Sequence, residues 1–95
     1  MIIELKKFGI VLTSRQSGRE AYLAFSPSLP SDGNDEIVVD FAGVSVFSPS
    51  WGDEFLTPLQ TTFGERLVLK NTTNPSVALT ISTLEKINKT KFTVV

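Results

Sequence analysis

The sequence predicts a single α/β domain, with a mixed sheet of four or five strands flanked by three helices. Short apolar runs alternate along the chain with helix-start signals, and no stretch is long enough to be a domain linker. The expected order is ββαβαβαβ, and the βαβ crossovers are expected to be right-handed. At 95 residues the chain is long enough for one hydrophobic core and too short for two, so residues 1–95 are taken as one domain.

The first third of the chain predicts a hairpin, a helix and a loop. Apolar runs at residues 2–5 and 10–12, separated by a glycine, favour two antiparallel strands. A short helix follows, and its N-cap is either Ser14 or, through a capping box, Ser17. Residues 27–35 hold two prolines and several small polar residues, which predicts a loop.

The middle of the chain predicts the central strand and the second helix. Residues 36–41 are apolar without clean alternation, which is typical of a strand covered on both faces. Ser48 before a proline and Ser50 in a capping-box-like spacing are alternative N-caps. Pro58 is expected to kink the helix or to start a second segment, and Gly64 ends it. The apolar stripe that would face the sheet consists of Trp51, Phe55, Leu59 and Phe63.

The last third predicts a strand, a helix and a closing strand. Residues 66–70 have an apolar centre, and Asn74 followed by Pro75 repeats the cap-then-proline signal. Residues 92–95 are expected to close the sheet. One face of the third helix would carry Val77, Ile81, Leu84 and Ile87 or Asn88.

Composition excludes several classes of function. The formal net charge is −1, from nine Lys and Arg and ten Asp and Glu, so there is no global field to attract nucleic acid or an anionic membrane. The chain has neither Cys nor His, which removes disulfides, thiol catalysis and the usual zinc ligands. We therefore expect no metal and no cofactor. No apolar run approaches a membrane span and the N-terminus does not resemble a signal peptide, so a cytoplasmic location is expected.

The residues with the most specific arrangement surround the start of the second helix. Asp40, Ser48 and Ser50 are expected at one strand-to-helix junction, the place where open α/β proteins usually bind ligands. Asp40, with Gly43, would support the turn by accepting hydrogen bonds from loop amides, or would act as a pocket acid. The two serines would cap the helix, or one would carry a phosphate. Trp51 would pack in the core, or would anchor a partner.

Other motifs are weaker or absent. The turn leading to the second helix has one glycine and no following lysine, and no GxGxxG occurs, so no nucleotide fingerprint is present. Asp53 and Glu54 are adjacent and point about 100° apart on a helix, so they do not form a general acid/base pair. They are expected to complement the helix dipole. Arg15 and Arg19 lie one turn apart and would make a small cationic patch, or would be solvated or bonded to nearby carboxylates.

The segment DFAGVSVFSPSWGDEFLTPL, residues 40–59, resembles the signature of a bacterial STAS-like domain family of unknown function. The upstream segment LTSRQSGREA is similar to the serine-arginine helix entry of the same family. Together the two matches cover most of residues 8–64. The resemblance implies a small STAS-like fold over the whole chain.

That family in turn is similar to the STAS domains of anti-anti-sigma factors and sulfate transporters. In the anti-anti-sigma group, a serine at the corresponding helix start is phosphorylated by a kinase of the histidine-kinase-like ATPase fold. In this register Ser48 takes the place of an aspartate, Pro49 that of the phosphoacceptor, Ser50 that of a second serine and Trp51 that of a glycine. Proline cannot accept a phosphate, so a switch of this kind would need Ser48 or Ser50 as the acceptor.

The resemblance and the residues together predict a non-enzymatic regulatory module that binds a protein partner, such as a separate ATPase or kinase. The partner contact would consist of Ser48, Ser50, Trp51 and Asp53, with Asp40 supporting the turn from behind. The alternative is a sensor of a nucleotide or an anionic metabolite, with its pocket at the same junction. An enzyme is the least favoured class, because the usual nucleophile, base and metal-ligand sets are missing.

Overall fold

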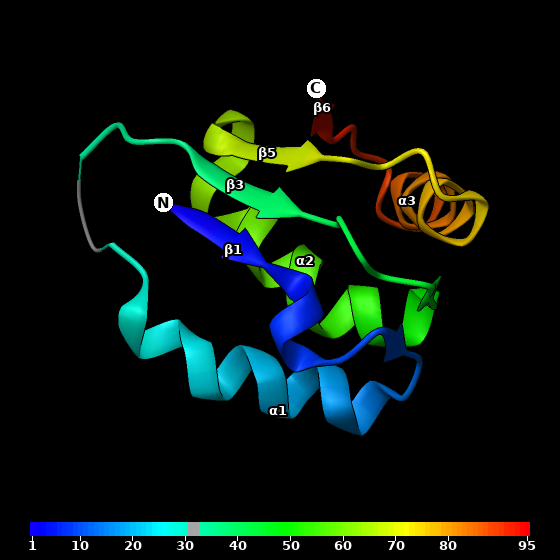
Figure 1. Ribbon diagram of the computed structural model, residues 1–95. Helices are drawn as coiled ribbons and strands as arrows, with labels where there is room; N and C mark the ends of the chain where they lie inside the picture. Colours follow the sequence, from blue (N-terminus) through cyan, green and yellow to red (C-terminus); the bar gives the residue numbers. More distant parts are fainter. Residues whose placement is uncertain (31–32) are drawn as a thin grey trace.

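The computed structural model describes residues 1–30 and 33–95 and has the predicted α/β architecture with three α-helices (Figure 1). The strands are β1 (Ile2–Glu4), β2 (Val11–Leu12), β3 (Ile37–Asp40), β4 (Val46–Phe47), β5 (Leu67–Lys70) and β6 (Thr93–Val94). The α-helices are α1 (Arg15–Phe25), α2 (Pro49–Phe63) and α3 (Pro75–Asn88), and the 3-10 helices are η1 (Leu5–Phe8), η2 (Ser26–Ser28) and η3 (Gly64–Arg66).

The strands form two sheets. One has four strands in the order β1-β3-β5-β6, and the other consists of β2 and β4. Every described pair is parallel, with Ile3 opposite Val39 in the first sheet and Val11 opposite Val46 in the second. The mixed sheet expected from the sequence is therefore replaced by parallel pairing, and β4 is a strand that the predicted order lacked.

The predicted N-terminal hairpin is wrong. The residues between β1 and β2 form η1, which buries Leu5 completely and packs Phe8 against the core. This helical turn carries the chain out of the first sheet, so β1 pairs with β3 while β2 pairs with β4. The complete burial of the Leu5 side chain at the start of η1 contributes about 2 kcal/mol.

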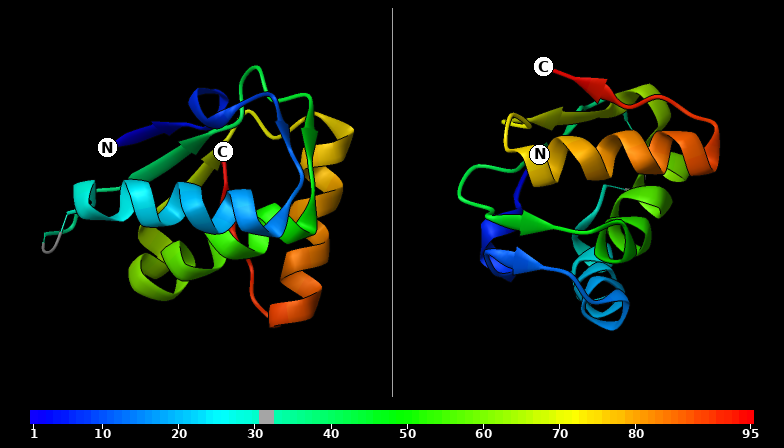
Figure 2. Two further views of the ribbon diagram at one scale, coloured as in Figure 1. Left: turned by 90° about the horizontal axis from the view of Figure 1, so that it is seen from below. Right: turned by 90° about the vertical axis from the view of Figure 1, so that its right-hand side faces the viewer.

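All three α-helices lie on the same side of the four-stranded sheet (Figure 2, right). The opposite face, which is turned to the viewer in Figure 1, carries no helix. Burial follows this arrangement, since Ile3, Val39 and Leu69 on the helix side are at most 2% exposed while Ile2 on the open face is 66% exposed. The core therefore lies between one face of the sheet and the helices.

Helices α1 and α2 run side by side in the same direction, and α3 crosses near the start of α2 (Figures 1 and 2). Helix α2 continues through Pro58 as one helix, so the alternative of a second segment starting there is wrong. It ends at Phe63 with Gly64 as its C-cap, as predicted. Its predicted stripe of Trp51, Phe55, Leu59 and Phe63 is buried. In α3 the predicted face is buried as far as Leu84, whereas Ile87 is exposed.

The loop predicted at residues 27–35 is partly described. It begins with the 3-10 turn η2, Ser26–Ser28, and it reaches β3 at Ile37. Residues 31 and 32, which belong to the predicted loop, lie outside the described residues.

Candidate functional site

The start of α2 is capped by Ser48, which decides between the two predicted caps. The Ser48 hydroxyl accepts a hydrogen bond from the Trp51 N–H at 3.3 Å, and Pro49 occupies the first helical turn. The same hydroxyl donates to the Thr13 carbonyl oxygen at 2.7 Å. Ser48 therefore joins the start of α2 to the residue that follows β2. Ser50 lies one position inside the helix and is partly exposed.

Asp40 belongs to a separate network at the end of β3. Its Oδ1 accepts hydrogen bonds from the Ala42 N–H at 2.9 Å and from the Asn71 side-chain amide at 2.7 Å. These hydrogen bonds, that from Asn71 first, hold the pKa of Asp40 below its ordinary value. Gly43 turns the chain with a φ of 85°, and a Cβ there would lie 3.3 Å from the Lys6 side chain.

Asp40 and Ser48 therefore do not share one strand-to-helix junction, as the sequence led us to expect. Strand β4 comes between them, and the chain follows β4 before it enters α2 (Figure 2). The hydrogen-bond partners of Asp40 lie in the β3 turn and after β5, whereas those of Ser48 lie before α1 and within α2. Asp40 supports a turn, and the candidate site is limited to the ends of β2 and β4.

Trp51 is a core residue, and its prediction as part of an exposed partner contact is wrong. Its side chain is 1% exposed and stacks on Phe55 with a ring-centroid distance of 5.1 Å. The rings of Phe47 and Phe8 pack on it at 5.8 and 6.1 Å. The indole fills the space between β4, η1 and α2, so it is a packed core side chain rather than an exposed one.

Asp53 connects α2 to α1. Its Oδ2 lies 3.0 Å from Nη1 of Arg15, and its Oδ1 accepts a hydrogen bond from Thr57 at 2.9 Å. Glu54 lies 3.7 Å from the same Arg15 nitrogen. Arg15 thus neutralises two carboxylates rather than forming a cationic patch with Arg19. The 38-residue separation between Arg15 and Asp53 explains why local spacing did not reveal this pair.

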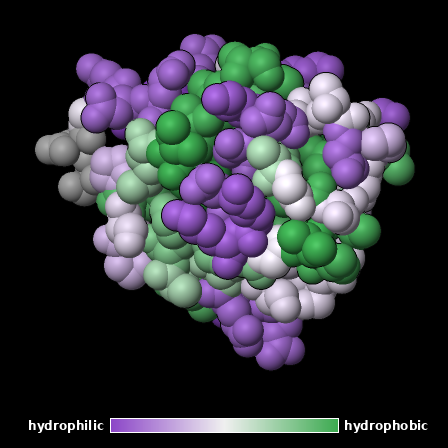
Figure 3. Space-filling model, in the orientation of Figure 1, coloured by the Kyte–Doolittle hydropathy of each residue, from purple (hydrophilic) through white to green (hydrophobic). Residues whose placement is uncertain are grey.

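Three exposed apolar residues at this end of the molecule were missed as site candidates. Ile10, Val11 and Val46 are 56, 58 and 40% exposed, and Val11 and Val46 are cross-strand partners. Figure 3 shows hydrophobic residues at the lower right, toward β2. The signal for β4 was present in the sequence only as the short apolar group Val44, Val46 and Phe47 around Ser45. The partner of β4 and the exposure of Val46 were not.

We call the surface formed by Ile10, Val11, Val46, Ser48, Ser50 and Asp53 the helix-start surface. It combines apolar side chains on β2 and β4 with hydroxyl and carboxylate groups at the start of α2. In Figure 1 the starts of α1 and α2 lie together beside these strands. This mixture of an exposed apolar centre and polar surroundings is typical of protein interfaces.

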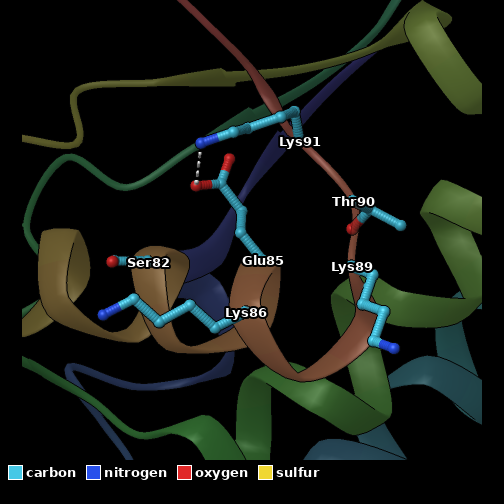
Figure 4. A pocket seen from close by; sticks show the side chains of 6 residues that line it. All are labelled: Ser82, Glu85, Lys86, Lys89, Thr90 and Lys91. Carbon is cyan, nitrogen blue, oxygen red and sulfur yellow. Dashed lines mark ion pairs between the residues drawn. The ribbon is translucent and has the colours of Figure 1, made fainter.

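Three hollows are found on the described surface, and two of them border the helix-start surface at Val11 and at Asp53. One lies between α1 and α2 and is lined in part by Asp53 and Arg19, and a second lies between β2 and α1. The third surrounds the end of α3, where three lysines point in different directions and one of them, Lys91, pairs with Glu85 at 3.8 Å (Figure 4). These lysines do not converge on one anion. None of the three hollows is lined by Asp40, Ser48 or Ser50.

Among residues 1–30 and 33–95, none of the helices combines the length and the apolar character of a membrane span.

The sequence model of a family described as a STAS-like domain of unknown function matches residues 17–77, which include β3, β4, α2 and β5 together with most of α1 and the first turn of α3. Neither the curated proteins nor the solved structures contain a significant match.

Proposed function

Because the chain belongs to the family of STAS-like domains of unknown function, we propose that it is a non-enzymatic regulatory module that binds a protein partner through the helix-start surface. The observation that carries this proposal is the exposed apolar pair Val11 and Val46, next to the capped start of α2. Apolar side chains left in water at one place favour association, because a partner that covers them removes apolar area from solvent.

The rigidity of the surface supports a binding role. Ser48 ties α2 to Thr13, and Arg15 ties α1 to Asp53, so both helix starts are held together beneath the exposed side chains. Trp51 packs under them as part of the core. A partner that binds a preorganised surface loses less conformational entropy on association than one that must order it.

A pull-down from extract of the native cell tests the proposal. The variant Val46→Glu, Ser50→Arg places charges at the centre and the edge of the surface. The control is Ile87→Glu, which repeats the Val46→Glu type of substitution at an exposed apolar position near the end of α3. We expect the double variant to recover at least about tenfold less of one specific protein than the wild type and the control do. Equal recovery by all three would refute the helix-start surface as the contact.

The resemblance to anti-anti-sigma domains points to the first class of partner to look for, an ATPase of the histidine-kinase-like fold. It also raises the question of a phosphoacceptor. Among the described residues the Ser50 hydroxyl makes no hydrogen bond, whereas that of Ser48 makes two. We therefore propose Ser50 as the acceptor if this chain is phosphorylated. Intact-mass analysis of native and Ser50→Ala protein checks this, since a phosphate that persists in the variant would exclude Ser50.

A further inference from the structure

Strand β2 has a partner on one side only. The Val46 and Ser48 N–H groups donate to the carbonyl oxygens of Ile10 and Leu12, at 3.1 and 3.0 Å. In a parallel pair the backbone groups of the residue between two such acceptors point to the other side. The N–H and C=O of Val11 therefore face away from β4. Within residues 1–30 and 33–95, neither group has a described hydrogen-bond partner.

The far edge of the same sheet is closed, which makes the open edge of β2 distinctive. The Ser76 hydroxyl of α3 accepts from the Phe47 N–H at 2.9 Å, and Thr80 donates to the Phe47 carbonyl oxygen. The Asn74 side chain donates to the carbonyl oxygens of Val44 and Ser45. Side chains of α3 thus satisfy the backbone of β4. Proteins commonly cover sheet edges in this way, because an open edge is a template for another strand.

A hollow of about 330 Å³ lies beside β2. Trp51 and Leu12 contribute to its walls, and the small side chains of Ala21 and Ala24 leave it unfilled. Its rim carries Glu20, whose carboxylate accepts a hydrogen bond from the Gln16 side-chain amide at 3.2 Å. Glu20 has no cationic partner among the described ion pairs. The hollow thus offers an apolar interior and an acidic rim.

We propose that the edge of β2 binds an extended segment of the protein partner as an added strand. The segment would exchange backbone hydrogen bonds with Val11, insert one apolar side chain into the hollow and place a lysine or arginine near Glu20. Added strands gain affinity from main-chain hydrogen bonds and specificity from pockets that accept alternate side chains, and β2 with its hollow provides both. This inference rests on the proposed function, since it specifies how the helix-start surface recognises its partner.

Selection from a displayed library of random short peptides tests the hollow. We expect binders with alternating apolar residues and at least one basic residue. The variant Ala24→Trp fills the hollow, and its matched control Leu23→Trp adds the same ring at the adjacent residue, which lines the groove between α1 and α2. Selected peptides should bind Ala24→Trp at least about tenfold more weakly than the wild type and the control. No binders, or equal affinity for all three folded proteins, would overturn the proposal.

Amide exchange tests the backbone contact itself. In the wild type, a bound peptide should slow exchange of the Val11 amide at least about tenfold relative to the free chain. Val11→Pro removes that N–H without removing a bond to β4, and Val11→Thr keeps it. Peptide affinity should fall about tenfold in the proline variant and stay unchanged in the threonine variant. If the Val11 amide is not protected, strand addition is wrong even where the peptide binds.

Pull-downs with these variants distinguish the failure of strand addition from the failure of the proposed function. A cellular partner that is lost with Val46→Glu, Ser50→Arg but retained with Val11→Pro and with Ala24→Trp would leave the helix-start surface in place and reject strand addition. Protection of the Val11 amide that rises with protein concentration, in the absence of peptide, would instead identify a second copy of the chain as the occupant and overturn the partner assignment. Loss with all three variants supports both proposals.

Discussion

The starts of α1 and α2 use the same elements but have different surroundings. Each helix follows a short strand, is capped by a serine and carries a glycine four residues after the cap, as Ser14 with Gly18 and Ser48 with Gly52. In both, the glycine N–H donates to the carbonyl oxygen of the capping serine. Among the described residues, the Ser14 hydroxyl accepts a hydrogen bond from the Ser17 N–H and makes no other. The Ser48 hydroxyl accepts one within α2 and also donates one to the carbonyl oxygen of Thr13, the residue before Ser14. The start of α2 is thus hydrogen-bonded to the residue that precedes the start of α1.

The two glycines show the same asymmetry. A Cβ on Gly18 would lie 2.6 Å from the Trp51 carbonyl oxygen, which belongs to the backbone of α2. A Cβ on Gly52 would meet the Phe47 ring at 3.0 Å and a Leu84 methyl group at 3.1 Å. Helix α1 therefore rests directly on the backbone of α2, while α2 contacts β4 and α3 through side chains. Helix α2 is therefore the central element against which α1 on one side and β4 and α3 on the other pack.

The largest expected effect tests whether the α2 start is the centre of packing. Trp51→Ala should lower the free energy of unfolding by about 3–5 kcal/mol, because it removes a buried ring and leaves a cavity. Urea unfolding of the wild type and the variant measures the change. A loss below about 1 kcal/mol, the value typical of an exposed residue, would contradict the burial of the indole.

The next test compares the two glycines directly. Gly18→Ala should destabilise the protein by about 1–3 kcal/mol, since the backbone of α2 must move to admit the methyl group. Gly52→Ala should be neutral to within about 1 kcal/mol, because side chains can adjust and alanine favours the helix. Urea unfolding of both variants checks the order. If Gly18→Ala is the better tolerated of the two, the close approach of α1 to the α2 backbone is wrong.

The two caps are expected to differ by a smaller amount. Ser14→Ala should cost about 0.5–1 kcal/mol, and Ser48→Ala about 1–2 kcal/mol, because it also leaves the Thr13 carbonyl oxygen without its donor. Thermal unfolding of the two single variants measures the difference. Ser48→Asp serves as the control, since aspartate can cap the helix but cannot donate to Thr13. Equal losses of stability in the two alanine variants would contradict the proposed link between the start of α2 and Thr13.

The smallest expected effect on stability is that of Asp40, which lies in the turn after β3, away from the starts of α1 and α2. The pKa of Asp40 is lowered in the folded chain, so its contribution to stability is present above the unfolded value of about 3.9 and is lost as pH falls through the folded pKa. Asp40→Asn should therefore lower the melting temperature at pH 7 and make little difference at pH 2.

A double-mutant cycle tests whether the turn after β3 and the start of α2 contribute to stability independently. The effects of Asp40→Asn and Ser48→Ala should add within about 0.5 kcal/mol, because the two side chains share no hydrogen-bond partner. A larger interaction energy in the double-mutant cycle would mean that the β3 turn and the α2 start form one site after all.

Local signals predicted the helices well. Ser48 with Pro49 and Asn74 with Pro75 marked the starts of α2 and α3, because a cap and its proline act within one turn of the chain. The stripe through Trp51 predicted a buried face for the same reason, since helical spacing alone places those residues together.

Strand pairing was predicted less well. Two short apolar runs near the N-terminus are equally consistent with a hairpin or with two different parallel partners, and partner choice depends on residues far along the chain. The parallel pairing of Val11 with Val46 could not be read from either strand alone. The exposure of these valines, and with it the candidate surface, follows from that pairing.

The sequence by itself determined the fold class, the family, the helix starts and the absence of Cys and His chemistry, because these depend on composition or on residues within a few positions of each other. Only the tertiary structure decided that Trp51 is buried, that Asp40 is separated from Ser48 by β4, and that β2 has an open edge. Each of these depends on which distant segments pack together, and packing is set by the whole core rather than by any local pattern.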